Sequence, residues 1–82
     1  MYIDGVTLYY SPECPYCRQV LAFVGEHDIQ LNEKNVLDPG IGEELEEVSG
    51  QGGYPTLMIG NEALVGSDKI IAYLQQRLGR AA

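Results

Sequence analysis

A proline at residue 15, just after a strand-like segment, most constrains how this chain can fold. Residues 6–17 read VTLYYSPECPYC, and residues 6–10 are β-branched and aromatic, as in a buried strand. Pro15 suits the first residue of a helix, because its φ is already helical and its missing N–H would have no partner there. The first predicted unit is therefore a strand, a short loop and a helix that begins at Pro15.

The spacing of apolar residues along the sequence predicts the remaining strands and helices. Alternating or β-branched residues predict three further strands, at residues 29–36, 55–59 and 63–65. Spacings of three and four predict helices from Pro15 to the segment 26–28, over 41–49, and from 67 onward. The last helix is expected to have Ser67 or Asp68 as its N-cap and to end at Gly79, flanked by Arg77 and Arg80.

The order of these elements predicts the fold class. A βαβ unit implies a parallel pair of strands, and the hairpin at 55–65 adds antiparallel strands. We therefore expect an α/β fold of order βαβ-ββα, with a four-stranded mixed sheet flanked by three helices on both of its faces. A chain of 82 residues is long enough for one core, so residues 1–82 are expected to form a single domain.

The charge balance excludes two classes of partner. The chain has five Lys and Arg against twelve Asp and Glu, for a net charge of −7. Its cations are scattered along the sequence: Arg18, Lys34, Lys69, Arg77 and Arg80. Because phosphate backbones and anionic membrane surfaces both attract clustered Lys and Arg, we expect neither nucleic acid nor a membrane as a partner. The glutamates of 41–49 are interpreted as a solvated helix face rather than a metal site.

The N-terminal segment MYIDGVTLYY has no basic stretch followed by a long apolar run. Nowhere does an apolar run approach the ~20 residues that span a bilayer. We therefore expect a cytoplasmic protein, in a compartment where thiols are kept reduced.

Cys14 and Cys17 are the two cysteines of the chain. A disulfide between them would close so short a loop that it would restrain the unfolded chain little, so a structural role is disfavoured. If the helix begins at Pro15, Cys14 sits at its N-terminus, where free N–H groups and the helix dipole favour a thiolate. Cys17 follows one turn later. The pair predicts attack by Cys14 on a disulfide, after which Cys17 or another thiol resolves the mixed disulfide.

A CxxC pair can also serve in a metal site, in a cluster or in a protein core. A zinc site within one chain lacks ligands, because there is no second CxxC and His27 is the one histidine. An iron–sulfur cluster shared between two chains and a pair of inert core cysteines both stay open.

The segment 10–17, YSPECPYC, resembles the active-site segment of dithiol glutaredoxins, whose typical signature is CPYC. YPT at 54–56 corresponds to the segment in which that family has a cis-proline, and GSD at 66–68 to its turn before the last helix. The stretch 54–74, with IIAYL near its end, is also similar to the N-terminal domain of glutathione transferases. The resemblance covers essentially the whole chain and implies the thioredoxin-like (glutaredoxin) fold.

The resemblance implies a role for each matching residue. Cys14 would be the nucleophile and Cys17 the resolving thiol. The backbone of Tyr54, turned toward Cys14 by a cis bond to Pro55, would pair with the cysteinyl part of glutathione. Tyr16 would form a wall of the cleft.

The resemblance implies different binding residues for the two ends of glutathione. Ser67 and Asp68 would hold the γ-glutamyl end, although both are also expected as helix caps without a ligand. Ser11 stands where many glutaredoxins have a lysine that meets the glycine carboxylate, so Gln51 is the remaining polar candidate for that group. Loss of one charge-assisted contact costs about 1.5–3 kcal/mol, so weaker glutathione binding is expected.

We therefore expect a glutathione-dependent thiol–disulfide oxidoreductase, a glutaredoxin that reduces protein disulfides and glutathione mixed disulfides. No bound cofactor and no metal is expected; glutathione is the reducing co-substrate, and disulfide-containing or glutathionylated proteins are the other partners of a monomer. Three alternatives stay open. They are an oxidoreductase reduced by a thioredoxin reductase, a non-catalytic module that binds glutathione or an iron–sulfur cluster, and a transferase-like role.

Overall fold

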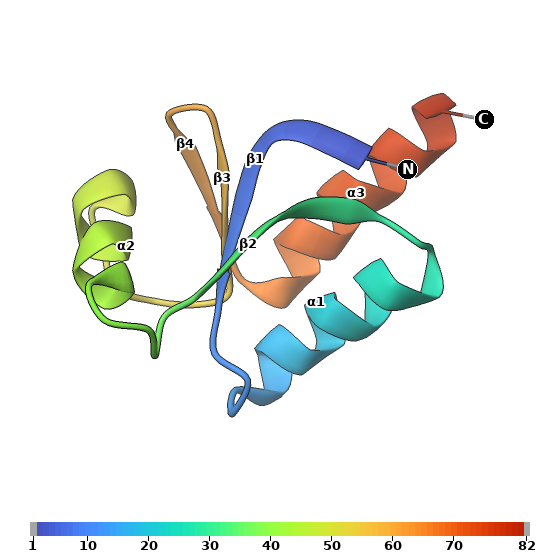
Figure 1. The fold of residues 1–82 in the computed structure, drawn as a ribbon. Coiled ribbons are helices and arrows are strands. Elements are labelled where there is room, and N and C mark those ends of the chain that lie inside the picture. Colours follow the sequence, from blue (N-terminus) through green and yellow to red (C-terminus); the bar gives the residue numbers. More distant parts are fainter. Residues whose placement is uncertain (1, 82) are drawn as a thin grey trace.

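Four strands and three helices follow one another in the order β-α-β-α-β-β-α (Figure 1). The computed structural model describes residues 2–81, and the side chains of residues 2–79. The elements are β1 (Tyr2–Tyr10), α1 (Pro15–Glu26), β2 (Gln30–Asn35), α2 (Ile41–Ser49), β3 (Thr56–Ile59), β4 (Glu62–Val65) and α3 (Ser67–Ala81). None of the helices in this described part is long and apolar enough to cross a membrane.

The strands form one sheet in the order β2-β1-β3-β4. β1 pairs with β2 in parallel, and α1 connects the two. β3 pairs antiparallel with β1 and with β4, with Leu57 opposite Leu8 on one side and opposite Leu64 on the other. The predicted mixed sheet of a thioredoxin-like fold is therefore confirmed.

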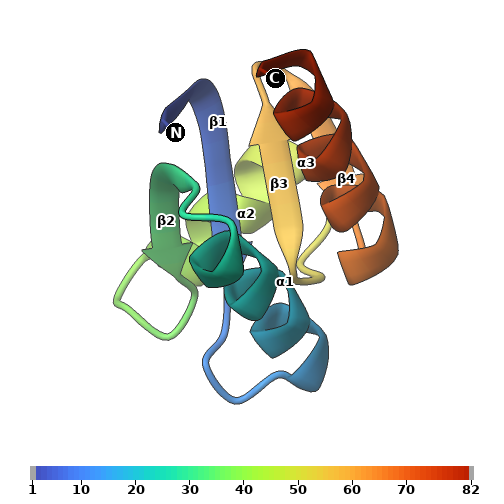
Figure 2. The same ribbon diagram turned by 90° about the vertical axis from the view of Figure 1, so that its right-hand side faces the viewer.

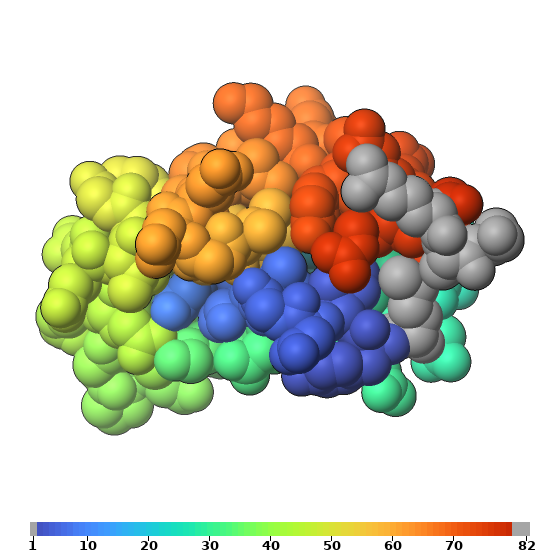
Figure 3. Space-filling view, turned by 90° about the horizontal axis from the view of Figure 1, so that it is seen from above, coloured from blue at the N-terminus to red at the C-terminus, as the bar shows by residue number. Residues whose placement is uncertain are grey.

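Helices cover both faces of the sheet. Figure 2 shows α1 and α3 in front of the sheet and α2 behind it, and in Figure 3 α2 and α3 lie at opposite sides of the molecule. Since successive side chains of a strand point to opposite faces, Leu8 of β1 packs into the core shared with α1 and α3, whereas Tyr9 packs against Leu45 of α2.

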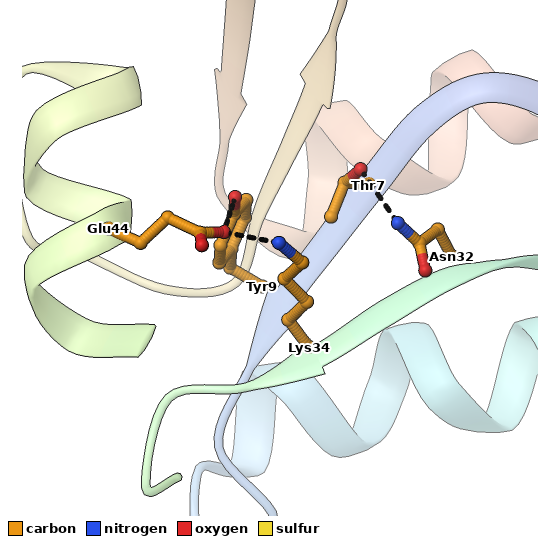
Figure 4. A network of polar contacts seen from close by, with 5 residues as sticks. All are labelled: Thr7, Tyr9, Asn32, Lys34 and Glu44. Atoms are coloured by element: carbon orange, nitrogen blue, oxygen red, sulfur yellow. Dashed lines mark hydrogen bonds and ion pairs between the residues drawn. The ribbon is translucent and has the colours of Figure 1, made fainter. Parts of the chain in front are cut away.

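A polar network ties α2 to the sheet (Figure 4). The hydroxyl of Tyr9 donates a hydrogen bond to Oε2 of Glu44, and Nζ of Lys34 lies 2.6 Å from the same oxygen. Glu44 is therefore half-buried and bonded, so the expectation of a solvated face was wrong for this residue. Glu43, Glu46 and Glu47 are exposed, as expected.

β1 is longer than the expected strand. It begins at Tyr2, and its register with β2 shifts between Tyr2 and Thr7. Gly5 has a φ of 80° inside this irregular stretch, as in a bulge that uses a glycine in the left-handed region. The Asp4–Gly5 pair interrupts the β-branched pattern, which is why the sequence predicted a strand from residue 6 only.

α3 begins at Ser67 as predicted, but its predicted N-cap and its predicted C-terminal end were wrong. The carbonyl of Gly66 accepts the first helical bond, from the N–H of Ile70 at 3.2 Å, so Gly66 rather than Ser67 or Asp68 is the N-cap. At the other end the helix continues through Gly79 to Ala81, because one glycine costs a helix only about 1 kcal/mol relative to alanine. The side chain of Arg80, expected near that end, lies outside the described residues.

Candidate active site

The two cysteines lie at the start of α1, as predicted. Pro15 is the first helical residue and Cys14 is the N-cap, with an extended backbone (φ −88°, ψ 123°). The side chain of Cys14 is partly exposed, whereas Cys17, one turn later, is fully buried. Both are free thiols. The site therefore presents one accessible sulfur with a second sulfur behind it.

The surroundings of Cys14 favour its thiolate. Burial of the sulfur acts against ionisation, but the backbone N–H and the thiol of Cys17, the backbone N–H of Tyr16 and the charge of Arg18 outweigh it. As a result the pKa of Cys14 is lowered from that of an ordinary cysteine. These N–H groups belong to the first turn of a helix, where they have no partner within the helix. A lowered pKa increases the fraction of the nucleophilic form near neutral pH.

Cys17 has the opposite properties. Burial raises its pKa to about 11, and the neighbouring sulfur of Cys14 raises it as well. The backbone N–H of Ser11, which donates to the sulfur of Cys17 at 3.4 Å, only partly offsets these effects. The pKa values of the two thiols are therefore shifted in opposite directions, so Cys14 is the more readily ionised of the two.

Arg18 orders the loop that leads to Cys14. Its Nε donates a hydrogen bond to the carbonyl of Pro12 at 3.0 Å, while the N–H of Glu13 donates to Oγ of Ser11 at 3.3 Å. The sequence did not show whether a side chain at this helical position would turn toward the loop or away from it. Arg18 is thus a residue of the site that sequence reasoning left undecided.

A cleft of about 350 Å³ opens where α1, β3 and α3 begin. The residues predicted to contact glutathione line it with one exception: Tyr16, Tyr54, Pro55, Ser67 and Asp68. The Tyr54–Pro55 bond is cis, as the resemblance implied. Tyr16 and Tyr54 are 62% and 43% exposed, so the cleft has an open aromatic rim. The structure brings these residues together, and the binding role of each stays a prediction.

Gln51 is the exception. Its side chain is used within its own loop, where Oε1 accepts the N–H of Gly53 and Nε2 donates to the hydroxyls of Ser49 and Thr56 at 3.2 and 3.3 Å. The hydroxyl of Ser67 is also engaged, since it donates to Oε1 of Gln19 at 3.1 Å and so joins α3 to α1. Gln51 does not reach the cleft, and Ser67 reaches it with its hydroxyl already bonded.

Sequence reasoning missed Lys69, which lines the cleft next to Asp68. Lys69 directly follows the segment GSD, but its place in the cleft depends on Tyr54 and the start of α3 lying next to each other. Among the described side chains, no cluster of three or more His, Cys, Asp or Glu residues is arranged to hold a metal ion.

Comparison with known proteins decides the family. Residues 8–81 match the family model described as glutathione S-transferase, N-terminal domain. The chain belongs to this family. The match includes both cysteines, the cis-proline and the start of α3, so every part of the cleft lies inside this glutathione S-transferase N-terminal domain.

Solved structures share its fold. A trimeric glutathione transferase of Leishmania superposes with a TM-score of 0.70 at 24% identity, over 89% of this chain and 17% of that one. A buckwheat glutaredoxin–glutathione complex superposes with a TM-score of 0.66 at 17% identity, over 88% and 69% of the two chains. These superpositions show that the domain has the same fold as these proteins.

A curated relative matches part of the chain. The global transcriptional regulator Spx of Listeria monocytogenes is 41% identical over 44 residues, which is 52% of this chain and 34% of Spx. The chain thus covers about a third of the length of this relative.

Proposed function

We propose that this glutathione S-transferase N-terminal domain is a glutathione-dependent thiol–disulfide oxidoreductase that acts on glutathionylated proteins and on protein disulfides. One observation carries the proposal: a partly exposed sulfur with a lowered pKa lies at the N-terminus of α1, with a buried, neutral thiol one turn behind it. Such a pair suits thiol–disulfide exchange, in which a thiolate attacks a disulfide and a second thiol later resolves the mixed disulfide.

With a glutathionylated protein, the thiolate of Cys14 attacks the glutathione sulfur. The protein–glutathione disulfide breaks, a Cys14–glutathione disulfide forms, and the protein thiolate leaves and takes a proton from solvent. A second glutathione, as thiolate, then attacks the glutathione sulfur of the mixed disulfide. Cys14 is released as thiolate and oxidised glutathione is the product, so one free glutathione is oxidised for each protein thiol that is released.

With a protein disulfide, Cys17 completes the first half of the reaction. Cys14 attacks one substrate sulfur, and the other leaves as a thiolate. The departing thiolate takes up a proton, and the thiol of Cys17, once deprotonated, attacks the sulfur of Cys14. A Cys14–Cys17 disulfide forms and the substrate is released reduced; two glutathione molecules then reduce that disulfide.

Glutathione as co-substrate is supported by the cleft. One structural neighbour, from buckwheat, is a glutaredoxin–glutathione complex. In this domain, most of the residues that the resemblance assigns to glutathione line the cleft between Tyr16 and Asp68. We assign the backbone of Tyr54, beside the cis bond to Pro55, to the cysteinyl part of the ligand, and Ser67 and Asp68 to its γ-glutamyl end. We place the reaction in the cytoplasm and take the acting species to be a monomer.

The test is the rate of deglutathionylation of a glutathionylated peptide with glutathione and glutathione reductase. Cys14→Ser is expected to abolish it, and Cys17→Ser to retain it, since only the protein-disulfide route needs the second thiol. Reduction of a protein disulfide should be lost in both variants. Equal loss of deglutathionylation in the two variants would overturn this division of roles.

The likeness to Spx favours a second candidate, a redox-responsive module of a regulatory protein. In that case Cys14 and Cys17 would cycle with oxidation but turn over slowly. Multiple turnovers per minute with glutathione would exclude it. Turnover supported by thioredoxin reductase and NADPH, but not by glutathione, would instead favour a thioredoxin-type reductant.

A further inference from the structure

The side chain of Gln51 spans the loop that leads from α2 to the cis bond. This loop lies between Ser49, the last residue of α2, and Thr56, the first residue of β3. Nε2 of Gln51 donates to the hydroxyls of these two residues at 3.2 and 3.3 Å. Its Oε1 accepts the N–H of Gly53. One side chain therefore bonds to both ends of the loop and to its middle.

Three residues of this loop line the cleft: Gly53, Tyr54 and Pro55. The N–H of Gly53 is bonded to Gln51, and its carbonyl accepts the hydroxyl of Thr56 at 2.7 Å. The carbonyl of Pro55 accepts the N–H of the residue that precedes α3 at 3.0 Å. Within the described part of the chain, neither the N–H nor the carbonyl of Tyr54 has a hydrogen-bond partner. Tyr54 thus presents two unpaired backbone groups between neighbours that are held in place.

Gln51 packs so closely over Gly53 that a side chain at residue 53 would displace it. A Cβ atom there would lie 2.5 Å from Oε1 of Gln51, whereas the next residue in its path, Val65, would be 3.9 Å away. The φ of Gly53 lies outside the left-handed region, so its backbone accepts an alanine. Alanine at residue 53 therefore removes the Gln51 contact and disturbs little else.

The composition of the loop explains why such a contact matters. Residues 50–53 read GQGG, and glycine gives a chain more conformational freedom than any other residue. A ligand that pairs with the backbone of a mobile loop must order that loop, which lowers its affinity. The hydrogen bonds of Gln51 order the loop before a ligand binds.

We propose that Gln51 is a positioning residue, which holds the backbone of Tyr54 in the geometry that the substrate requires. Gln51 does not reach the cleft, so it acts through Gly53 and the ends of the loop. This inference rests on the proposed function, in which Tyr54 pairs with the cysteinyl part of glutathione. It adds the residue that fixes the geometry of that pairing.

The test is the steady-state release of a fluorescent peptide from its mixed disulfide with glutathione, in the presence of glutathione and glutathione reductase. Gln51→Ala is expected to raise the KM of the peptide about fivefold or more and to leave kcat within about twofold, because ordering of the loop then opposes binding. Alkylation of Cys14 by iodoacetamide, which does not pair with Tyr54, should match the wild type. Gln76→Ala, the same change at an exposed glutamine of α3, is the matched control.

A double-mutant cycle shows whether Gly53 acts through Gln51. Gly53→Ala should raise KM about as much as Gln51→Ala does, and it should cause no further increase in the Gln51→Ala protein. Gly52→Ala is the control for a change of glycine in the same loop. A Cβ at residue 52 would lie 3.2 Å from Oε1 of Glu46, the end of a flexible side chain, and would not touch Gln51.

Amide hydrogen exchange, followed by NMR, tests the loop without a substrate. The N–H of Gly53 is expected to exchange about fivefold faster or more in Gln51→Ala than in the wild type, because its acceptor is lost. The amides of β1 should exchange at unchanged rates, which shows that the variant is folded. Equal exchange of the Gly53 amide in the two proteins would mean that Gln51 does not order the loop.

Two kinetic results would also overturn the inference and leave the proposed function intact. They are an unchanged KM in Gln51→Ala, and additive effects of Gln51→Ala and Gly53→Ala. If wild-type Cys14 reacts with iodoacetamide but does not release the peptide, the proposed function fails, and the positioning role fails with it. The activity of the wild-type protein therefore distinguishes the two failures.

Discussion

Arg18 folds back over the loop before α1 and donates a hydrogen bond from Nε to the carbonyl of Pro12 at 3.0 Å. This bond holds the guanidinium near the N-terminus of the helix, one turn along from Cys14. Burial of the sulfur and the N–H of Cys17 act more strongly on the pKa of Cys14, and the charge of Arg18 adds to its lowering. Arg18 therefore has two effects: its hydrogen bond orders the loop before α1, and its charge helps to lower the pKa of Cys14.

Arg18→Ala is expected to raise the pKa of Cys14, because both the positive charge and the bond to the loop are lost. The measurement is the pH midpoint of Cys14 alkylation by iodoacetamide. Arg18→Lys should show a smaller increase, since it keeps the charge without the planar donor group. Arg77→Ala is the control for net charge. A midpoint that does not move in Arg18→Ala would show that Arg18 has no electrostatic role.

Cys17 is expected to resist alkylation in the folded protein. With a pKa raised to about 11 by burial, its thiolate fraction at pH 7 is on the order of one in ten thousand. Limiting iodoacetamide at pH 7 should therefore modify Cys14 alone, as mapped by mass spectrometry of proteolytic peptides. In urea both cysteines should be modified at similar rates. Comparable labelling of both under native conditions would contradict the buried, neutral state of Cys17.

Glu44 is expected to make the stability of the fold depend on pH. The hydrogen bond from Lys34, followed by that from Tyr9, lowers its pKa in the folded state. The stabilisation is therefore present above the ordinary glutamate pKa of about 4.3, and it is lost as the pH falls through the folded-state value. Glu44→Gln should lower the free energy of unfolding at pH 7 and flatten its decrease on acidification.

Urea denaturation at pH 7 and in acid measures both effects. Glu47→Gln, an exposed substitution on the same helix, is the matched control and should behave as the wild type. An acid response in Glu44→Gln identical to that of the wild type would mean that the network of Tyr9, Lys34 and Glu44 does not stabilise the fold.

The core that supports α3 can be tested with one pair of substitutions. Leu74 is fully buried between α3 and the sheet, so Leu74→Ala should reduce the free energy of unfolding by about 2–5 kcal/mol. Leu37 is 59% exposed, and Leu37→Ala should change it by about 0.5 kcal/mol or less. Equal effects in a urea titration would contradict the described packing.

Most of the fold could be predicted because its signals are local. Pro15 determines where α1 begins whatever surrounds it, and the apolar spacing around Leu45 and Val20 determines which helix faces are buried. The positions of Cys14 and Cys17 followed from this one helix start, so the two sulfurs of the site were predictable as well.

The rest depends on contacts between distant segments. Whether Gly79 ends a helix, whether Glu44 faces water or Tyr9, and whether Gln51 is free for a ligand are decided by neighbours that the local pattern does not reveal. Lys69 was missed for the same reason, since its place in the cleft requires Tyr54 and α3 to be adjacent.

The most direct test of the account is the pH dependence of Cys14 alkylation in the wild-type protein, with each modified residue identified by mass spectrometry. N-acetylcysteine, measured in the same buffers, provides the ordinary thiol. A midpoint for Cys14 clearly below that of N-acetylcysteine is the predicted result. A midpoint equal to or above it would contradict the claim that the start of α1 stabilises a thiolate.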